Sequence, residues 1–188
     1  MGAAFLKLLF VIATPIVVWA LAAAIMMHMT GRDKFPRTDI PESAPLNERL
    51  GGYNAAAASA YWQWLGNDGR LAERRFLEAD MIFPFAYGGA MLASILLAWA
   101  ALGRPFDPVL LIAPVIIAVI ADWIENLVHW RQLRNFLQTE PVQATWIQIS
   151  SIATSTKWLF ILLSMLLILG FSIWMFIHEW VTSNNIAN

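Results

Sequence analysis

The chain has 188 residues, of which 59% are hydrophobic and only 13% are charged, whereas about 25% of the residues in an ordinary soluble domain are charged. This composition excludes a water-soluble domain, a disordered chain, collagen and a coiled coil, and it predicts an integral membrane protein. A net charge of -1 gives no reason to expect a nucleic acid or another polyanion as partner. Because the sequence contains no cysteine, disulfides, thiolate metal sites and cysteine nucleophiles are excluded as well.

The first apolar stretch covers residues 4–27 and is long enough to cross a bilayer, which takes about 20 residues. Small residues near its end, Ala20, Ala22 and Ala24, could instead mark a secretory signal. The apolar run is longer than the core of a signal peptide. We therefore expect a first membrane span.

A long loop, residues 28–80, separates this span from a second one predicted at 81–102. The loop begins with prolines among polar residues, a composition typical of coil. Its segment 53–64 is rich in alanine and aromatic residues and has no charge, which predicts a short helix lying in the membrane interface. From residue 70 to 79 we expect a helix that leads into the second span.

The third span, predicted at 108–130, is free of charge only over residues 109–121. That stretch is too short to cross alone, so Asp122 must lie at or below the membrane surface. In the second loop, residues 131–157, the sequence Thr139-Glu140-Pro141 is typical of the end of one helix and the start of the next. We expect a helical hairpin here, followed by a fourth span at 158–180. The predicted fold is an all-α, four-helix membrane bundle with an interfacial helix and a hairpin extension.

The basic residues predict the orientation of the bundle. Two of the twelve, Lys7 and Arg104, lie at the end that carries both termini. Short loops rich in Lys and Arg stay in the cytoplasm, so we expect both long loops there and both termini on the non-cytoplasmic side of the cell (inner) membrane. The other ten are Arg32, Lys34, Arg37, Arg49, Arg70, Arg74, Arg75, Arg131, Arg134 and Lys157.

Four polar residues of the third span form one stripe. Asp122, Glu125, Asn126 and His129 are spaced i, i+3, i+4 and i+7, which places them on one face of a helix. Ionisable residues inside a membrane are functional candidates by default. This stripe is the first candidate site.

Neighbouring spans are expected to bring further polar residues to the same depth. Antiparallel folding of the second and third spans about the turn at 103–107 places Tyr87 level with Asp122, and Asp80 level with His129. Two registers are open for Lys157. A tight turn at 139–140 places it level with Asp122, whereas alignment of the two apolar spans places it level with His129.

A structural interpretation of this cluster is that its charges hold the helices in register. Lys157 would then pair with Asp122 or Glu125, and Asp80 would pair with His129 or Arg131. Asn126 would hydrogen-bond between helices.

A functional interpretation starts from the number of ionisable groups. Three carboxyl groups, a lysine, a tyrosine and up to two histidines, with His28 predicted on the same side, exceed what holding four helices requires. Such groups could perform acid/base chemistry. Glu125 and His129 have a spacing that metal ligands can use, but no His-x-x-x-His or Glu-x-x-His pair is present, so we predict no metal site.

Proline and glycine residues mark a special region of the second span. Pro84 removes one helical hydrogen bond, so the backbone carbonyl of Asp80 lacks its usual donor. Gly88 and Gly89 let another helix approach closely. We interpret both features as packing devices.

Two motifs on adjacent spans carry a resemblance to a protein family. The segment 80–88, DMIFPFAYG, and the segment 122–126, DWIEN, resemble the paired D-x-x-F-P-x-x-Y-G and D-x-x-E-N pattern of small, uncharacterised four-span integral membrane proteins. The resemblance extends over residues 80–126, about a quarter of the chain, and implies no activity, cofactor or substrate. It implies a shared constellation of Asp80, Pro84, Tyr87, Asp122, Glu125 and Asn126.

We therefore predict a small membrane protein that binds a lipid-like molecule or serves as accessory subunit of a larger membrane complex, in contact with membrane lipids and protein partners. The alternative is an intramembrane acid/base enzyme, less readily a metal-dependent one, acting on a lipid or isoprenoid. A proton-coupled small-molecule carrier is the third hypothesis. No cofactor is identified. The candidate site residues are Asp80, Tyr87, Asp122, Glu125, Asn126, His129 and Lys157.

Overall fold

The computed structural model describes residues 2–35, 38, 40–104 and 107–186, and within these ranges it contains helices and no strand. The prediction of an all-α fold is confirmed. Three short 3-10 helices, η1 (Arg32–Lys34), η2 (Pro41–Ser43) and η3 (Leu46–Glu48), lie in the first loop. The α-helices are α1 (Gly2–Thr30), α2 (Ala55–Trp64), α3 (Gly66–Asp80), α4 (Phe83–Ala101), α5 (Pro108–Leu137) and α6 (Ala144–Ile186).

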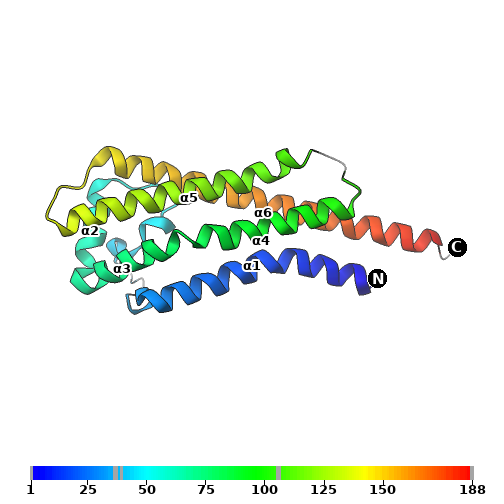
Figure 1. Ribbon diagram of the computed structural model, residues 1–188, viewed down its shortest axis with the longest axis horizontal. Helices are drawn as coiled ribbons and strands as arrows, with labels where there is room; N and C mark the ends of the chain where they lie inside the picture. The colour runs from blue at the N-terminus through cyan, green and yellow to red at the C-terminus, as the bar shows by residue number, and fades with distance from the viewer. Residues whose placement is uncertain (1, 36–37, 39, 105–106, 187–188) are drawn as a thin grey trace.

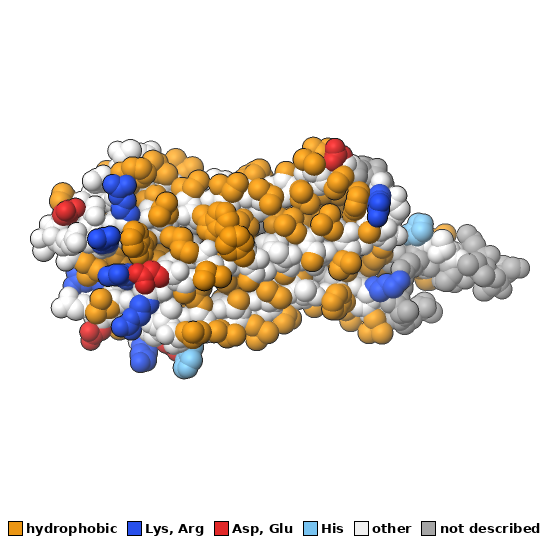
Figure 2. Space-filling view, viewed as in Figure 1, with side chains coloured by type: hydrophobic (Ala, Val, Ile, Leu, Met, Phe, Trp, Pro, Cys, Tyr) orange, Lys and Arg blue, Asp and Glu red, His pale blue; other side chains and the backbone are white. Residues whose placement is uncertain are grey.

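Four stretches of the described chain are helical, long and apolar enough to cross a membrane: α1, α3 with α4, α5 and α6. They lie side by side in an elongated bundle, with both termini at one end and α2 and α3 at the other (Figure 1). We call the end with α2 and α3 the polar end. On the face shown in Figure 2, Lys and Arg side chains gather mainly at this end, and apolar side chains cover the middle. These features fit an integral membrane protein.

Two hydrophobic cores hold the bundle together. The first lies among the spanning helices and includes Tyr87, Met91, Ile95, Val115 and Ile168. The second lies at the polar end and includes Leu46, Ala58, Tyr61, Trp62, Leu65, Leu77, Leu133 and Ile147. The helix predicted at 53–64 forms as α2, but its Tyr61 and Trp62 are buried against protein instead of facing the interface, because the second core encloses them.

The α3–α4 junction shows what Pro84 does. Pro84 lies in the first turn of α4, where a missing N–H is tolerated, so the helix is interrupted before it instead of being kinked around it. As predicted, the Asp80 carbonyl needs another donor, and the Asn126 side-chain amide of α5 supplies it at 3.1 Å. The interruption therefore creates a specific contact between α3 and α5.

Gly88 lets α4 and α5 approach closely, as predicted. A Cβ atom at this position would lie 2.6 Å from Cγ2 of Val119, well inside van der Waals contact. At Gly89 no atom lies within 4 Å of such a Cβ. Only the first of the two glycines is required by this packing.

The hairpin of α5 and α6 is the most extensive helix pair of the bundle. Both helices continue beyond the membrane spans predicted for them, to Leu137 and from Ala144, so the connection between them is short. Thr139 adopts a positive φ of 65° in this connection. The short turn sets the register in which α6 faces α5.

Candidate functional site

The centre of the site is an ion-pair cluster between α5 and α6. The Lys157 ammonium group lies 2.5 Å from Oε2 of Glu125 and 3.1 Å from Oδ1 of Asp122. All three residues are at most 5% exposed. Of the two predicted registers, the structure adopts the one that the tight turn at 139–140 produces.

Asp122 also receives hydrogen bonds from its neighbours. The Tyr87 hydroxyl on α4 donates to Oδ2 of Asp122 at 2.9 Å, and the Asn126 amide donates to Oδ1 at 3.3 Å. Tyr87 thus lies level with Asp122, as its depth predicted. Asp122 is the residue at which α4, α5 and α6 meet.

Asp80 lies beside this cluster, with its side chain buried at 4% exposure. In the part of the chain that the structure describes, it forms no ion pair, so the predicted pairing with His129 or Arg131 is wrong. His129 turns toward the first loop instead, and the Arg131 guanidinium lies over the Trp146 ring. Asp80 is therefore a buried carboxyl group without a cationic partner among the described residues.

His129 is bound by Tyr53, which lies outside the membrane-spanning helices. The Tyr53 hydroxyl is 2.6 Å from Nε2 of His129, 2.9 Å from Oγ of Ser150 and 3.1 Å from Oγ1 of Thr154. Burial raises the pKa of the Tyr53 hydroxyl above its ordinary value, and the nearby Glu125 carboxylate raises it further. The neutral hydroxyl is thus retained at neutral pH, and His129 serves to hold the first loop against α5 and α6.

His28 does not join the cluster, contrary to its predicted place. Its side chain is 86% exposed, and its Nδ1 lies 3.3 Å from Oδ2 of Asp33. The last turn of α1 brings it to the polar end, as its depth predicted, but directs it away from the other helices. Depth alone did not reveal which face of α1 it occupies.

A cavity of about 340 Å³ reaches the cluster from the side of α1. Its charged and hydroxyl-bearing wall includes Asp80, Tyr87, Asp122 and Lys157. Most of the remaining wall is aromatic or aliphatic and comes from α1, α3, α4 and α6: Trp19, Ala23, Met26, Met27, Phe76, Phe83, Trp158 and Ile161. The buried charges are thus accessible from an apolar space.

The first loop closes the cavity at the polar end. Asn47 and Glu48 of η3 line it, and the Asn47 carbonyl oxygen accepts a hydrogen bond from the Trp158 indole at 2.9 Å. Leu46 is buried in the second core. Further along the loop, the Ser155 hydroxyl donates to the Leu50 carbonyl oxygen at 3.3 Å. These hydrogen bonds hold the first loop against α6.

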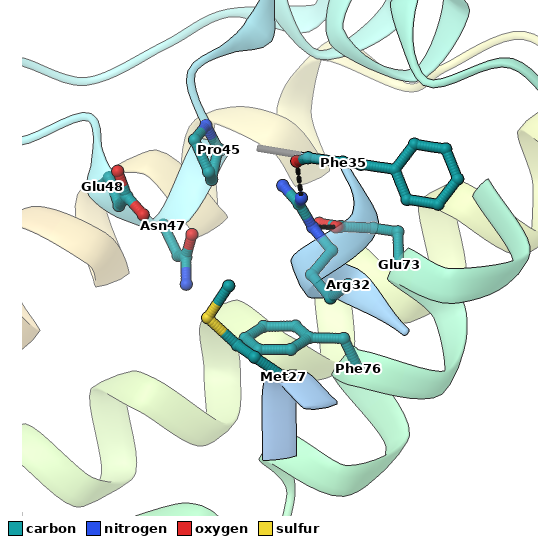
Figure 3. A pocket seen from close by; sticks show the side chains of 8 residues that line it. All are labelled: Met27, Arg32, Phe35, Pro45, Asn47, Glu48, Glu73 and Phe76. Carbon is teal, nitrogen blue, oxygen red and sulfur yellow. Dashed lines mark hydrogen bonds and ion pairs between the residues drawn. The ribbon is translucent and has the colours of Figure 1, made fainter. Parts of the chain in front are cut away.

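A smaller cavity, of about 90 Å³, adjoins the first and shares Met27, Asn47, Glu48 and Phe76 with it. Figure 3 shows Arg32 beside Glu73 and directed at the Phe35 carbonyl oxygen, on the opposite side of this cavity from Asn47 and Glu48. The two cavities together extend from the ion-pair cluster toward the polar end.

The cation of the smaller cavity is fully engaged. Arg32 Nε lies 2.5 Å from Oε2 of Glu73, Nη1 donates to the Phe35 carbonyl oxygen at 2.6 Å, and Nη2 donates to the Tyr61 hydroxyl. The Tyr61 hydroxyl donates to the same Glu73 oxygen at 2.9 Å. The sequence did not predict this cluster, because its members lie far apart along the chain and no helical spacing relates them.

The sequence also did not predict the part that α1 plays in the site. One signal was present: Trp19 lies inside an apolar span, away from the interfaces where tryptophan usually anchors a helix. In the structure Trp19 lines the cavity. Trp158 likewise contributes to its wall, next to Lys157 in the chain.

The carboxyl groups of the cluster do not form a metal-binding arrangement. Among the described residues, no group of three or more Asp, Glu or His side chains is placed to hold a metal ion. The position between Asp122 and Glu125 is taken by the Lys157 ammonium group.

The site is thus a buried, charged cluster at the wall of an apolar cavity. The resemblance to four-span membrane proteins through the two motifs stays a prediction. When the chain is compared with protein-family models, with curated proteins and with solved structures, none of them matches it.

Proposed function

We propose that the protein binds a lipid-like molecule in the cavity between α1 and α6. The observation that carries the proposal is an apolar cavity of about 340 Å³ that ends on Asp80, Tyr87, Asp122 and Lys157. Sites for small ligands typically measure about 300–1,000 Å³, with mostly apolar walls and a few polar groups that orient the ligand. The cavity has this character.

The position of α1 supports a route by which a ligand enters the cavity from the bilayer. In the most apolar window of α1 only 11% of the residues are buried, whereas the other three spans have 28–39%. Trp19 and Met27, which line the cavity, are also 42% and 37% exposed. The cavity therefore borders the lipid-facing surface, and a ligand reaches it beside α1.

Some residues of the cluster hold the helices together, and others are available for binding. Lys157 with Asp122 and Glu125 links α5 to α6, which is what the structural interpretation expects. Asp80 and Tyr87 also lie on the cavity wall, where they are available to a ligand's polar group.

Binding is favoured over acid/base catalysis by the position of His129. A catalytic acid must reach the substrate, but His129 contacts Tyr53 and does not line the cavity. The cavity likewise supports a ligand-binding role ahead of an accessory-subunit role, since it offers a site within the chain itself.

We further infer that the polar end faces the cytoplasm. Nine of the ten basic residues of the two long loops lie in the described ranges, and Arg37 lies outside them. The excess over the opposite end, which has Lys7 and Arg104, supports this orientation through the positive-inside rule.

The proposal is tested by filling the cavity. The purified chain in phosphatidylcholine nanodiscs is incubated with tritiated dodecylamine, dodecanol or dodecanoate, and empty nanodiscs supply the background. Ala23→Trp places an indole into the cavity, whereas Ala24→Trp places the same group on the exposed face of α1. We expect at least one probe to bind saturably to the wild type and to Ala24→Trp, and not to Ala23→Trp.

The double variant Asp122→Asn with Glu125→Gln keeps the shapes of both side chains and removes their charges. If it folds with normal thermal stability and loses probe binding, the charges serve binding; if it loses stability, they serve the fold. Absence of saturable binding of all three probes to the wild type refutes the proposed function.

A further inference from the structure

We propose that the molecule bound in the cavity is an amphiphile with a cationic amine head group, which Asp80 and the surrounding aromatic rings hold. This inference rests on the proposed function and specifies its ligand. It follows from three features of the site: an excess of carboxyl groups, an aromatic wall, and the full engagement of both nearby cations.

The cluster contains more carboxyl groups than cations. Lys157 pairs with Asp122 and Glu125, and the third carboxyl group, that of Asp80, has no ion pair among the described residues although it is 96% buried on the cavity wall. Within the same described part of the chain, Oε1 of Glu125 is buried and has no hydrogen-bond partner.

A buried carboxylate without a cation costs several kcal/mol. Native structures leave few buried polar groups unpaired, and an exception points to a missing partner. The Asp80 carboxyl group has a hydrogen bond from the Asn126 side chain but no ion pair among the described residues, so the partner that it lacks is one that carries positive charge. The cavity is the space from which it can come.

The aromatic wall suits a cation in particular. A cation within about 6 Å of a ring centroid is attracted by the negative face of the ring, most strongly in a desolvated site. Lys157 already lies over the Trp158 ring at 5.9 Å, so one ring of this wall stabilises a cation in the structure. The aromatic residues that line the cavity are Trp19, Phe76, Phe83, Tyr87 and Trp158.

An anionic head group does not fit this site. Lys157, the only cation of the cavity wall among the described residues, is shared by two carboxylates. Arg32 in the adjoining cavity is bound by Glu73, Tyr61 and the Phe35 carbonyl. A phosphate or carboxylate would have to displace one of these partners and would lie beside the Asp80 carboxyl group.

The test compares three probes with the same tail and different heads. Dodecylamine, dodecanol and dodecanoate are assayed on the wild-type chain in nanodiscs at pH 7, as above. A charge-assisted hydrogen bond contributes about 1.5–3 kcal/mol, so we expect the amine to bind about tenfold or more tighter than the alcohol, and the carboxylate to bind most weakly.

Two variants of α3 then assign the preference to one residue. Asp80→Asn retains the shape and removes the charge, and we expect it to bind amine and alcohol with equal affinity. Glu78→Gln removes a negative charge two residues away, at an exposed ion pair with Arg74, and is expected to retain the preference for the amine.

Each result decides a separate point. Equal affinity of the three probes, or tightest binding of the carboxylate, overturns the amine head group and leaves the proposed function standing. An amine preference that survives in Asp80→Asn overturns the part given to Asp80. If Asp80→Asn does not fold, the ranking of the three probes on the wild type still decides the head group.

Discussion

Replacing Lys157 by methionine tests the ion-pair cluster most directly, because one ammonium group pairs with two buried carboxylates. Lys157→Met keeps an unbranched side chain and leaves Asp122 and Glu125, which are 2% and 0% exposed, without their cation. Removal of one partner of a buried ion pair costs about 3–5 kcal/mol. For a chain of this size, 1 kcal/mol shifts the melting temperature by about 2–4 °C, so we expect Tm to fall by about 6–20 °C.

The measurement is thermal unfolding of the purified protein in one detergent, followed by tryptophan fluorescence. Lys34→Met is the matched control, since Lys34 is exposed and a surface substitution changes stability by about 0.5 kcal/mol or less. Adding Asp122→Asn and Glu125→Gln to Lys157→Met removes the uncompensated charges, and we expect at least half of the lost Tm to return. A Tm for Lys157→Met equal to that of Lys34→Met would refute the conclusion that the ion pairs of Lys157 stabilise the fold.

Three further predictions follow from packing, hydrogen bonding and charge. Gly88→Ala forces a Cβ to within 2.6 Å of Val119 and should lower stability by about 1–3 kcal/mol, whereas Gly89→Ala should not; equal Tm values for the two would contradict the close approach of α4 and α5. Asn126→Leu leaves the Asp80 carbonyl without its donor and should lower stability by about 1–3 kcal/mol, which denaturant titration measures. Because the chain has no cysteine, single cysteines added at either terminus should react with a membrane-impermeant maleimide outside intact cells, and labelling only after lysis would reverse the orientation.

Local chemistry accounts for most of what could be predicted from the sequence. The length of each apolar run and the 3.6-residue period of a helix determine that four helices form and that Asp122, Glu125 and Asn126 share a face. The missing N–H of Pro84 determines that the Asp80 carbonyl needs an outside donor. These properties depend on neighbouring residues or on the thickness of the bilayer, and both can be inferred from sequence.

The tertiary structure decided which groups meet. Lys157 reaches Asp122 and Glu125, and not the level of His129, because the turn between α5 and α6 is short and both helices extend beyond the apolar residues. His129 is hydrogen-bonded to Tyr53 because the first loop folds back onto α6. Helical spacing does not encode this arrangement.

The cavity itself depends on segments that are distant in the chain. Its wall combines α1, η3, α3, α4, α5 and α6, and its shape depends on how loosely α1 packs against the others. Composition therefore predicted a membrane protein, and the positions of the spans and turns predicted which polar residues lie at the same depth. Both predictions depend on the order of residues along the chain and not on how the helices pack. Only the packing of helices against one another determined which carboxyl groups are paired and which one, Asp80, lies on the cavity wall without a cation among the described residues.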